Sequence, residues 1–475
     1  MIALLNLLLE VVGIIIEELV TLIIDALSSV IPSKRKEKYT AHFIEASKIL
    51  FKSHKGFCLT GDRSLSIEDS FLNFLLIAPS GAGKTSVIGI PSILRMAGAS
   101  SLVIHDCSGE LHEKTSGALA KQGYRVQILN YSQPQLSERY NPLERAQSLS
   151  DIKQISQIVV HAALGQGKDP FWNTSAEQII SFFGRYLVYY ASPQYRTLGN
   201  VLHLLNTFSG NPEQVDQLIV KTNDSSLITE YKAWVAYGDK TLMSIIATAR
   251  AALGIFSDES VAQVTSGDNI DFSSFRKEKQ ALYITNSVPL MKYYSVISAI
   301  FFEQFFGHVM SRICDKASLP IFFILDEAAI LSLRGILPTA ISNIRKYNSG
   351  NLQIYQHYNQ IVDNYGSAQA RNIATNCYAK VYMSPQPIEI AQELEATLGK
   401  FTFDDDGIQR TRPLMTADEI RQCKDSIILC GNNPPILAKM KPYYRQSSLK
   451  KLTEIPPVQP THSFSQAPPP LIQFD

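Results

Sequence analysis

The chain has 475 residues, of which 45% are apolar, and its 44 Lys and Arg residues nearly balance its 43 Asp and Glu residues. This length exceeds what one compact core normally holds and predicts two or three structural units. The balanced charge excludes binding of nucleic acid through an overall basic field, although a local basic patch remains compatible with it. The six cysteines form no C-x-x-C pair, which argues against a zinc site and favours reduced, packed thiols.

Residues 1–33 are almost wholly apolar and contain no Lys or Arg. If they form a helix, its polar and acidic positions fall in or beside one narrow stripe: Asn6, Glu10, Gly13, Glu17, Glu18, Thr21, Asp25 and Ser28. The absence of a positive N-terminal region disfavours a secretory signal. Several carboxylates at bilayer depth, at roughly 2–3 kcal/mol each, disfavour a lone spanning helix.

Two membrane-associated arrangements remain for this segment. The helix lies in the membrane interface, or it crosses the bilayer and hides its acidic stripe in a bundle. A helix buried in a cytosolic protein is the alternative. The basic run Lys34-Arg35-Lys36 follows at once, and the positive-inside rule then places the rest of the chain in the cytoplasm.

Short apolar runs that alternate with helical stretches predict a parallel α/β sheet. The predicted strands are residues 73–77, 101–104, 125–129, 281–285, 321–325, 352–355, 380–383 and 426–429. Between residues 145 and 265 the apolar positions instead recur at a spacing of three to four, as in Ile155, Ile158, Val159 and Ala162, which predicts an inserted all-helical domain.

These patterns divide the chain into six segments. We predict a membrane-associated helix at 1–33, a linker with short strands at 34–70, the first part of the α/β domain at 71–144, the all-α domain at 145–265, the second part of the α/β domain at 266–450, and a disordered Pro-rich tail at 451–475.

The strongest motif follows the first predicted strand and precedes a helical stretch: Ala78, Pro79, Ser80, Gly81, Ala82, Gly83, Lys84, Thr85 and Ser86. It has the strand and helix context of a Walker A loop, although Ala78 replaces the usual first glycine. The two glycines let the backbone N–H groups turn toward a phosphate, and the helix N-terminus adds favourable charge. Lys84 is expected to bind the β- and γ-phosphates of ATP, and Thr85 to ligate Mg²⁺.

A second motif lies about 240 residues further on, where the apolar run 321–325 ends in Asp326 and Glu327. This is the Walker B pattern, in which Asp326 holds a water ligand of Mg²⁺ and Glu327 acts as general base. Its distance from the Walker A loop fits a large domain inserted between the two halves of one site. Together the motifs predict a RecA-like P-loop domain of the α/β class with an inserted all-α domain and a short N-terminal membrane-associated helix.

With both motifs present, the chain resembles the type IV secretion coupling proteins, the TraG/TraD-type conjugative DNA-transfer ATPases, from about residue 56 to residue 444. Further matching stretches occur in the family's order: Asp106-Cys107-Ser108-Gly109-Glu110-Leu111, Tyr140-Asn141-Pro142-Leu143, Asp169-Pro170-Phe171-Trp172, Gln356 with Gln360 and Tyr365-Gly366, Arg412-Pro413-Leu414, and Pro434-Pro435-Ile436. Cys107 and Ser108 replace the family's Pro and Lys, which argues against a basic side chain acting there. The family usually begins with two transmembrane helices, whereas this chain has one short, acid-striped segment.

The resemblance implies a ring, usually hexameric, with the nucleotide between subunits. It implies that Arg345, in the stretch Ile344-Arg345-Lys346-Tyr347, is an arginine finger, and that Gln356 senses the γ-phosphate. The alternatives are a solvated arginine at a helix end and a polar residue at a strand edge. Trp172 is expected to belong to the core of the all-α domain.

The resemblance also implies an ATPase at the bacterial inner membrane that recruits relaxase-bound single-stranded DNA and pumps it through a type IV secretion channel. Expected partners are single-stranded DNA, relaxase and relaxosome proteins, the secretion channel, the inner membrane and further copies of the chain. Three alternatives stay open: a coupling ATPase that exports protein effectors, a docking receptor that binds nucleotide without hydrolysing it, and a soluble DNA helicase. The intact Glu327 argues against the second, and the apolar N-terminus against the third.

Overall fold

The computed structural model describes residues 40–165, 169–315, 317–331, 333–459 and 469–474. Its residues fall into two units, one of Phe43–Glu395 with Met415–Asp475 and one of Met1–His42 with Ala396–Leu414. In the described ranges, no helix has the length and apolar character needed to cross a membrane. The predicted membrane-associated helix at 1–33 lies outside the described residues.

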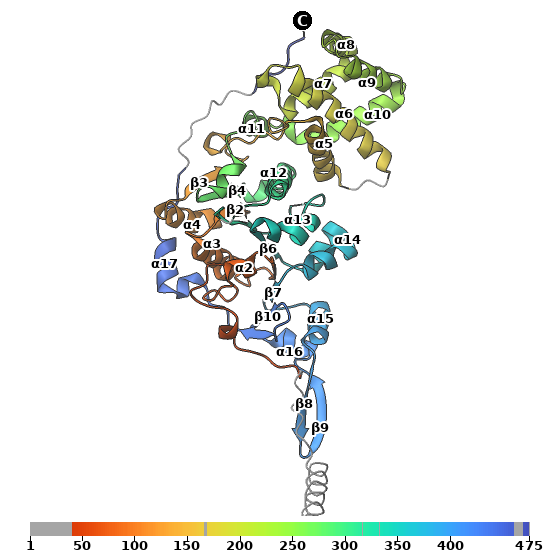
Figure 1. Cartoon of the computed structure of the whole chain (residues 1–475). Coiled ribbons are helices and arrows are strands. Elements are labelled where there is room, and N and C mark those ends of the chain that lie inside the picture. Colours follow the sequence, from red (N-terminus) through yellow and green to blue (C-terminus); the bar gives the residue numbers. More distant parts are fainter. Residues whose placement is uncertain (1–39, 166–168, 316, 332, 460–468, 475) are drawn as a thin grey trace, which may run out of the picture. The chain divides into compact units, whose positions relative to one another are not determined.

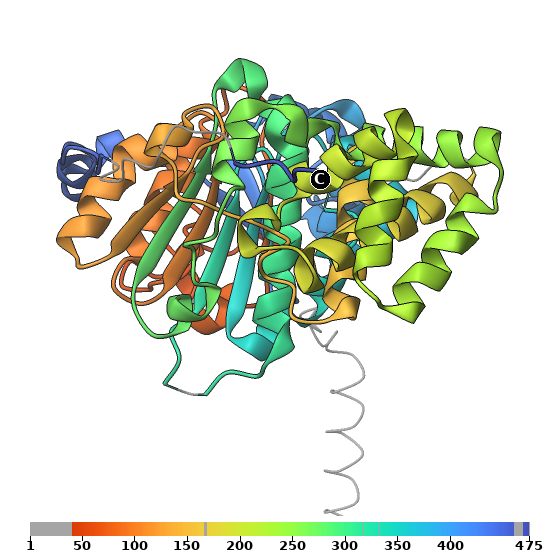
Figure 2. The same ribbon diagram turned by 90° about the horizontal axis from the view of Figure 1, so that it is seen from above.

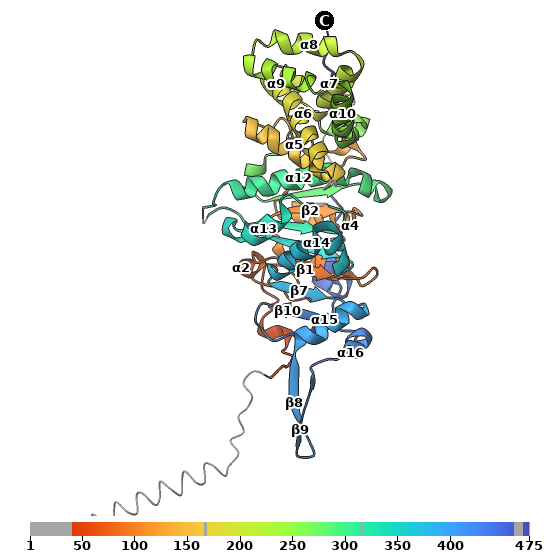
Figure 3. The ribbon, with the colours of Figure 1, turned by 90° about the vertical axis from the view of Figure 1, so that its right-hand side faces the viewer.

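Nine strands of the described chain form one sheet in the order β11-β10-β7-β1-β6-β5-β2-β4-β3. In Figure 1 the labelled strands β10, β7, β6, β2, β4 and β3 follow one another in this order. They are β1 (Phe74–Ile77), β2 (Ser101–Asp106), β3 (Arg125–Leu129), β4 (Gln280–Thr285), β5 (Ile321–Leu325), β6 (Ser349–Tyr355), β7 (Ala379–Tyr382), β10 (Ser426–Cys430) and β11 (Ile436–Ala438). The strands from β7 to β3 pair in parallel, and β10 pairs antiparallel with β7 and β11. In the side view, β2, β1, β7 and β10 follow one another in this order (Figure 3).

Helices cover both faces of this sheet, as parallel strands joined by crossovers require. Successive residues of β1 alternate between two cores, with Phe74 and Leu76 in one and Leu75 and Ile77 in the other. The first core contains side chains of α3 (Ile90–Met96), α4 (Glu110–Lys121) and α17 (Ser447–Thr453). The second contains side chains of α12 (Met291–Ser311), α13 (Leu337–Asn343) and α14 (Tyr358–Thr375). Three further helices are α2 (Ile67–Ser70), α15 (Ile388–Leu398) and α16 (Ala417–Gln422).

Between β3 and β4 the described residues form helices and no strand, and the helices are drawn in yellow and green in Figure 2. They are α5 (Leu149–Leu164), α6 (Pro170–Tyr189), α7 (Leu198–Gly210), α8 (Pro212–Lys221), α9 (Ser225–Val235), α10 (Asp239–Leu253) and α11 (Glu259–Val264). Local signals set their starts: Ser148 and Asp151 form a capping box for α5, and Asp169 accepts a hydrogen bond from the backbone N–H of Phe171 in α6. Trp172 is partly buried against the shared core of these helices.

Three described parts differ from the sequence-based expectations. Residues 40–70 contain isolated bridges, Phe51 with Ser64 and Cys58 with Ser64, in place of a strand pair. An unpredicted hairpin, β8 (Lys400–Asp405) and β9 (Ile408–Pro413), belongs to the smaller unit. Two described parts of the predicted disordered tail are ordered, because α17 reaches into it and Ile472 is buried.

Candidate functional site

The loop after β1 has the backbone geometry of a phosphate cradle. Gly81 and Gly83 have φ of +80° and +85°, in the left-handed region that side chains disfavour. Lys84 then has helical angles and leads into η2 (Thr85–Gly89), a π-helical turn that continues as α3. Backbone N–H groups at the start of a helix, together with its dipole, form a site for an anion.

The sheet topology brings four strand ends to this loop. The strands β1, β6, β5 and β2 are neighbours and run parallel, so their carboxyl ends lie at one edge of the sheet. The P-loop follows β1, Gln356 follows β6, Asp326 and Glu327 follow β5, and Asp106 ends β2. The crevice beyond such strand ends is where open α/β sheets bind their ligands. The Walker A and Walker B segments therefore meet in space.

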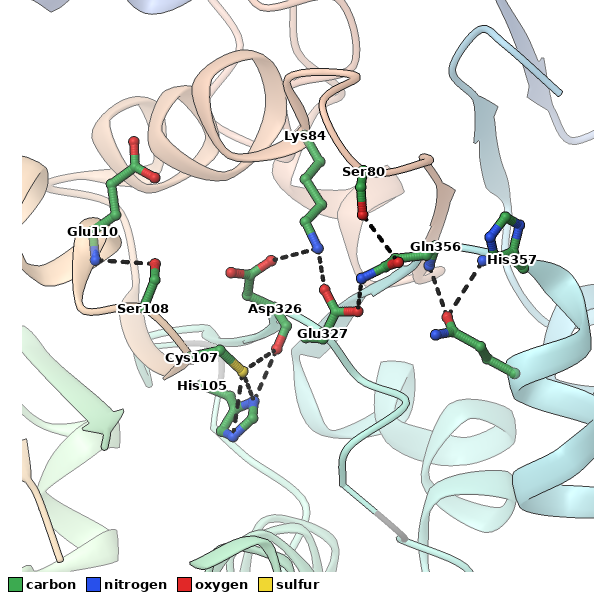
Figure 4. Close-up of polar contacts among 11 residues, drawn as sticks. Ser80, Lys84, His105, Cys107, Ser108, Glu110, Asp326, Glu327, Gln356 and His357 are labelled. Carbon is green, nitrogen blue, oxygen red and sulfur yellow. Dashed lines mark hydrogen bonds and ion pairs between the residues drawn. The ribbon is translucent and has the colours of Figure 1, made fainter. Parts of the chain in front are cut away.

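Polar contacts join these segments into one network (Figure 4). The Lys84 ammonium forms an ion pair with the Glu327 carboxylate, and its Nζ lies 3.9 Å from Asp326 Oδ1. The Gln356 side chain donates through Nε2 to Glu327 Oε1 and accepts from Ser80 Oγ at 3.1 Å. The loop, the acidic pair and the glutamine thus contact one another directly, although they are far apart in the sequence.

The backbone at Glu327 is strained. Its φ is +55°, a conformation that costs a side chain with a Cβ on the order of 1 kcal/mol. Flanking hydrogen bonds hold it there: the N–H of Asp326 donates to the carbonyl of His105 at 3.2 Å, and the N–H of Ala328 to the carbonyl of Ile354 at 2.9 Å. Sheet hydrogen bonding on both sides therefore fixes the direction in which Glu327 leaves the strand.

Two buried carboxyl groups lie at this edge. Burial is the main cause that raises the pKa of Asp326 to about 6; Lys84 opposes it, and Glu327 adds to it. Burial also raises the pKa of Asp106 to about 7. The hydrogen bond from the N–H of His112 lowers this pKa, and the charge of Asp326 raises it further. Among the described residues, Oδ1 of each aspartate is buried without a hydrogen-bond partner.

These two Oδ1 atoms accept no hydrogen bond and suit a hard cation, although Lys84 Nζ already lies 3.9 Å from that of Asp326. Mg²⁺ prefers oxygen ligands and binds proteins through one or two carboxylates beside phosphate oxygens and water. The buried carboxylate of Asp326 is therefore of a kind that Mg²⁺ binds, and binding the cation favours the ionised form.

Asp106 was not among the predicted site residues, although the stretch that contains it was noted. Two further residues, which the sequence does not assign to the site, also lie in it. The His105 ring lies 2.9 Å from the carbonyl of Asp326, and burial lowers its pKa to about 4. The Gln360 side chain accepts from the backbone N–H of Gln356 at 2.8 Å. The position of Asp106 at the end of an apolar run is the signal in the sequence, and only the fold shows that this strand lies beside β5.

Arg345 lies elsewhere. It is exposed on η8 (Ile344–Tyr347), directly before β6 begins at Ser349. Because β6 runs parallel to β1, Arg345 lies at the amino edge of the sheet, and the P-loop lies at the carboxyl edge. The structure therefore does not bring Arg345 to the Lys84 network of its own chain.

Comparisons with known proteins place this chain in a family. Residues 33–466 match the family described as Type IV secretory system Conjugative DNA transfer. The chain is 22% identical over 416 residues to the type IV secretion system-coupling protein VirD4 of Bartonella henselae, a match that covers 80% of this chain and 64% of that protein. VirD4 of Bartonella quintana is also 22% identical, over 411 residues, with 79% and 63% covered. The chain thus spans just under two thirds of the length of these relatives.

Solved structures have the same fold at low identity. The bacterial conjugative coupling protein TrwBdeltaN70 has a TM-score of 0.68 at 14% identity, covering 90% of this chain and 96% of that one. A TrwB structure described as a complex with ADP and Mg²⁺ has a TM-score of 0.67 at 14% identity, covering 90% and 97%. The RecA-like domain with an all-α insertion predicted from the sequence is confirmed by this likeness, and the family match over most of its length shows that the chain belongs to the type IV secretion coupling proteins of conjugative DNA transfer.

Proposed function

We propose that the chain is an ATP-driven coupling protein that recruits relaxase-bound single-stranded DNA and pumps it through a type IV secretion channel during conjugation. The observation that carries this proposal is the network of Lys84, Glu327 and Gln356 at the carboxyl ends of three neighbouring strands. A P-loop lysine beside a carboxylate that can accept a proton from water is the arrangement that phosphoryl transfer needs. Family membership supplies the DNA-transfer context.

The nucleotide proposed for this site is ATP with Mg²⁺. Similar TrwB structures are described as complexes with a non-hydrolysable ATP analogue and with ADP and Mg²⁺. In this chain the backbone of residues 78–86 would bind the phosphates, Lys84 the β- and γ-phosphate oxygens, and Thr85 and Asp326 the cation. Bound Mg²⁺·ATP supplies an electrophilic γ-phosphorus and a cation that offsets the charge developing on its oxygens.

The side chains of the network would then have separate tasks. Glu327 accepts the proton of the attacking water, and its strained, hydrogen-bonded backbone fixes its direction. Gln356 contacts Glu327 and Ser80 at once, so it links the position of the base to the phosphate loop. Lys84 gives up its ion pair with Glu327 when it binds phosphate oxygens, which frees that carboxylate to act as a base.

We further propose that the active form is a ring, a homo-hexamer, in which Arg345 acts on the site of the neighbouring subunit. Its exposure and its place at the opposite sheet edge support action between subunits rather than within one. A heterologous, head-to-tail contact between copies presents one edge of each subunit to the other edge of the next.

The remaining parts of the proposal follow from the family. The all-α domain receives the relaxase or relaxosome proteins, the motor domain lies in the cytoplasm, and the N-terminal segment 1–33 associates with the inner membrane near the secretion channel. Single-stranded DNA is gripped through its phosphates inside the ring.

Hydrolysis of ATP by the purified protein, measured with and without single-stranded DNA, tests the proposal. We expect single-stranded DNA to raise the rate, and Lys84→Ala to abolish both hydrolysis and conjugative transfer. Lys114→Ala is the matched control, since Lys114 pairs only with the adjacent exposed Glu113 among the ion pairs of the described chain. If the rate of ATP hydrolysis does not change with DNA but rises when a protein effector binds, the cargo is protein and not DNA. Normal transfer by Lys84→Ala would refute the motor.

A further inference from the structure

The last described residues of the chain, 469–474, lie along helix α7 of the all-α domain, where the C-terminal segment is seen in Figures 1 and 3. The side-chain amide of Asn200 bridges two backbone groups of this peptide. Its Nδ2 donates to the carbonyl of Pro470 at 3.0 Å, and its Oδ1 accepts from the N–H of Ile472 at 3.0 Å. His203, one turn further along α7, lies with Nε2 3.2 Å from the carbonyl of Ile472.

Asn200 is held in place for this contact. It is fully buried, and its Nδ2 also lies 3.2 Å from Oγ1 of Thr197, the residue that caps α7. A buried amide must satisfy both its donor and its acceptor, and the peptide backbone supplies one partner for each. The peptide therefore satisfies polar groups of α7 and is held to this helix by specific hydrogen bonds.

Two side chains of the peptide enter the domain. Ile472 is only 5% exposed and belongs to the same core as Val201 of α7. Phe474 packs against that core, and its ring lies 5.5 Å from the His203 ring. Leu471 before them is 45% exposed, and Gln473 between them is exposed as well. Alternate residues thus point inward, as in other extended peptides that bind through their backbone.

This pattern defines what the groove recognises. Asn200 and His203 contact backbone groups, and any residue except proline supplies these groups at the position of Ile472. The two inward side chains therefore determine which peptide sequences bind. The groove fits an extended peptide with a branched aliphatic residue two positions before an aromatic residue. Pro468, Pro469 and Pro470 precede the motif in the sequence and stiffen the peptide before it binds.

The peptide is tethered at a fixed point. The N–H of Val458 donates to Ser116 Oγ on α4 at 3.1 Å, and a Cβ added to Gly117 would come within 2.1 Å of the carbonyl oxygen of Pro456. Ten residues separate Val458 from Pro469. A short tether holds its peptide at an effective concentration of the order of 1 mM, so the groove stays occupied even if the free peptide binds with an affinity of only about 100 µM.

We propose that α7 forms a peptide-binding groove that the chain's own C-terminal residues occupy, and that a protein presenting an extended peptide of the same pattern binds the all-α domain by displacing them. Three backbone contacts to Asn200 and His203 and two inward side chains hold the peptide, and a competing peptide of the same pattern can make all of them. The inference does not depend on ATP hydrolysis.

The test adds a fluorescent peptide of residues 469–475 to full-length protein and measures its anisotropy. Ile472→Asp in the protein removes the inward aliphatic side chain of the tail and leaves the groove intact, so we expect it to bind the added peptide about tenfold more tightly than the wild type does. Leu471→Asp is the matched control at an exposed position and should behave as the wild type.

The groove itself is tested in the Ile472→Asp background. Asn200→Asp removes the donor to Pro470 and should weaken peptide binding at least about tenfold, while the far-UV circular dichroism spectrum of the same protein stays unchanged and reports an intact fold. An added peptide that itself carries aspartate at the position of Ile472 should not bind. Equal peptide binding by wild-type protein, Ile472→Asp and Leu471→Asp would overturn the inference.

Discussion

The nucleotide site and the α7 groove both join residues that are distant in the sequence, but they are specified in different ways. At the nucleotide site, adjacent parallel strands deliver Lys84, Glu327 and Gln356 to one edge of the sheet, so topology alone brings the motifs together. At the groove, no strand order fixes the contact, and a single amide, Asn200, with the apolar pocket for Ile472 selects the peptide.

The two sites also differ in electrostatics. The sheet edge concentrates carboxyl groups of raised pKa, Asp106 and Asp326, whose burial costs stability in return for a cation site. The groove uses a neutral amide with satisfied partners and adds stability as it forms. The comparison indicates that catalysis and recognition place opposite demands on buried polar groups in this chain.

The largest predicted effect tests whether the nucleotide site, unlike the groove, is completed by a second copy. Arg345→Ala should reduce ATP hydrolysis by about 10³-fold or more if Arg345 acts as an arginine finger. Mixing Arg345→Ala with Lys84→Ala protein should restore about a quarter of the interfaces, because some then pair an intact Lys84 with an intact Arg345. Hydrolysis rates of the separate and mixed proteins measure this. A mixture no more active than its components would place Arg345 outside the reaction.

The next effect concerns the base. Glu327→Gln should keep its contact with Gln356 and bind ATP, yet lose about 10²-fold or more in hydrolysis, because an amide cannot accept the proton of the attacking water. Single-turnover hydrolysis beside ATP binding separates the two steps. Glu113→Gln, at an exposed carboxylate on α4, is the control and should hydrolyse normally. Parallel losses of binding and hydrolysis in Glu327→Gln would assign Glu327 a structural role instead.

A third prediction tests the electrostatic cost of the sheet edge. The pKa of Asp106 is about 7 in the folded protein and about 3.8 in the unfolded chain, so the unfolded chain releases this proton first as pH rises. The contribution of Asp106 to the free energy of unfolding therefore falls between about pH 4 and pH 7. Asp106→Asn removes this loss, so the variant's free energy of unfolding relative to wild type should be about 4 kcal/mol more favourable at pH 8 than at pH 4.

Urea unfolding at the two pH values measures the difference, and Asp418→Asn, at an exposed carboxylate, serves as the control. A pH-independent effect of Asp106→Asn would mean that Asp106 ionises normally in the folded protein.

The smallest prediction concerns the tether of the groove peptide. Gly117→Ala should destabilise the protein by about 1 kcal/mol, because the new Cβ meets the carbonyl of Pro456. Glycine to alanine in a helix otherwise stabilises by roughly 0.5–1 kcal/mol. Gly307→Ala in α12, where a Cβ meets no atom of the described chain within 4 Å, should follow that ordinary trend. Thermal unfolding of the two variants compares them. Stabilisation by both would show that residues 455–458 do not rest on α4.

Much of the sheet is predictable because strands buried on both faces are continuous apolar runs. The predicted strand 321–325 is such a run and has the observed bounds of β5, while 125–129 has the bounds of the edge strand β3, which carries Arg125 and Gln127. The site follows from the same reasoning, since motifs after parallel strands must meet at one edge. Asp106 escaped because its burial depends on β2 lying beside β5, a neighbour relation that the sequence order hides.

The β8–β9 hairpin and the contacts of Ile472 are two features that the apolar patterns of the sequence do not predict. The β8–β9 hairpin turns at Asp406-Gly407, both with positive φ, a dipeptide typical of two-residue hairpin loops that was present in the sequence and not used. The contacts of Ile472 were not predictable, because one isoleucine in a Pro- and Gln-rich tail has no periodicity, and its pocket exists only in the folded all-α domain.

The most direct test of the account is equilibrium binding of ATP in the presence of Mg²⁺ to full-length wild-type protein and to Lys84→Ala and Asp326→Asn. The account predicts that wild-type protein binds ATP, that Lys84→Ala weakens binding with or without the cation, and that Asp326→Asn weakens it only when Mg²⁺ is present. Binding that is the same for all three proteins would contradict a triphosphate site between the P-loop and the acidic pair.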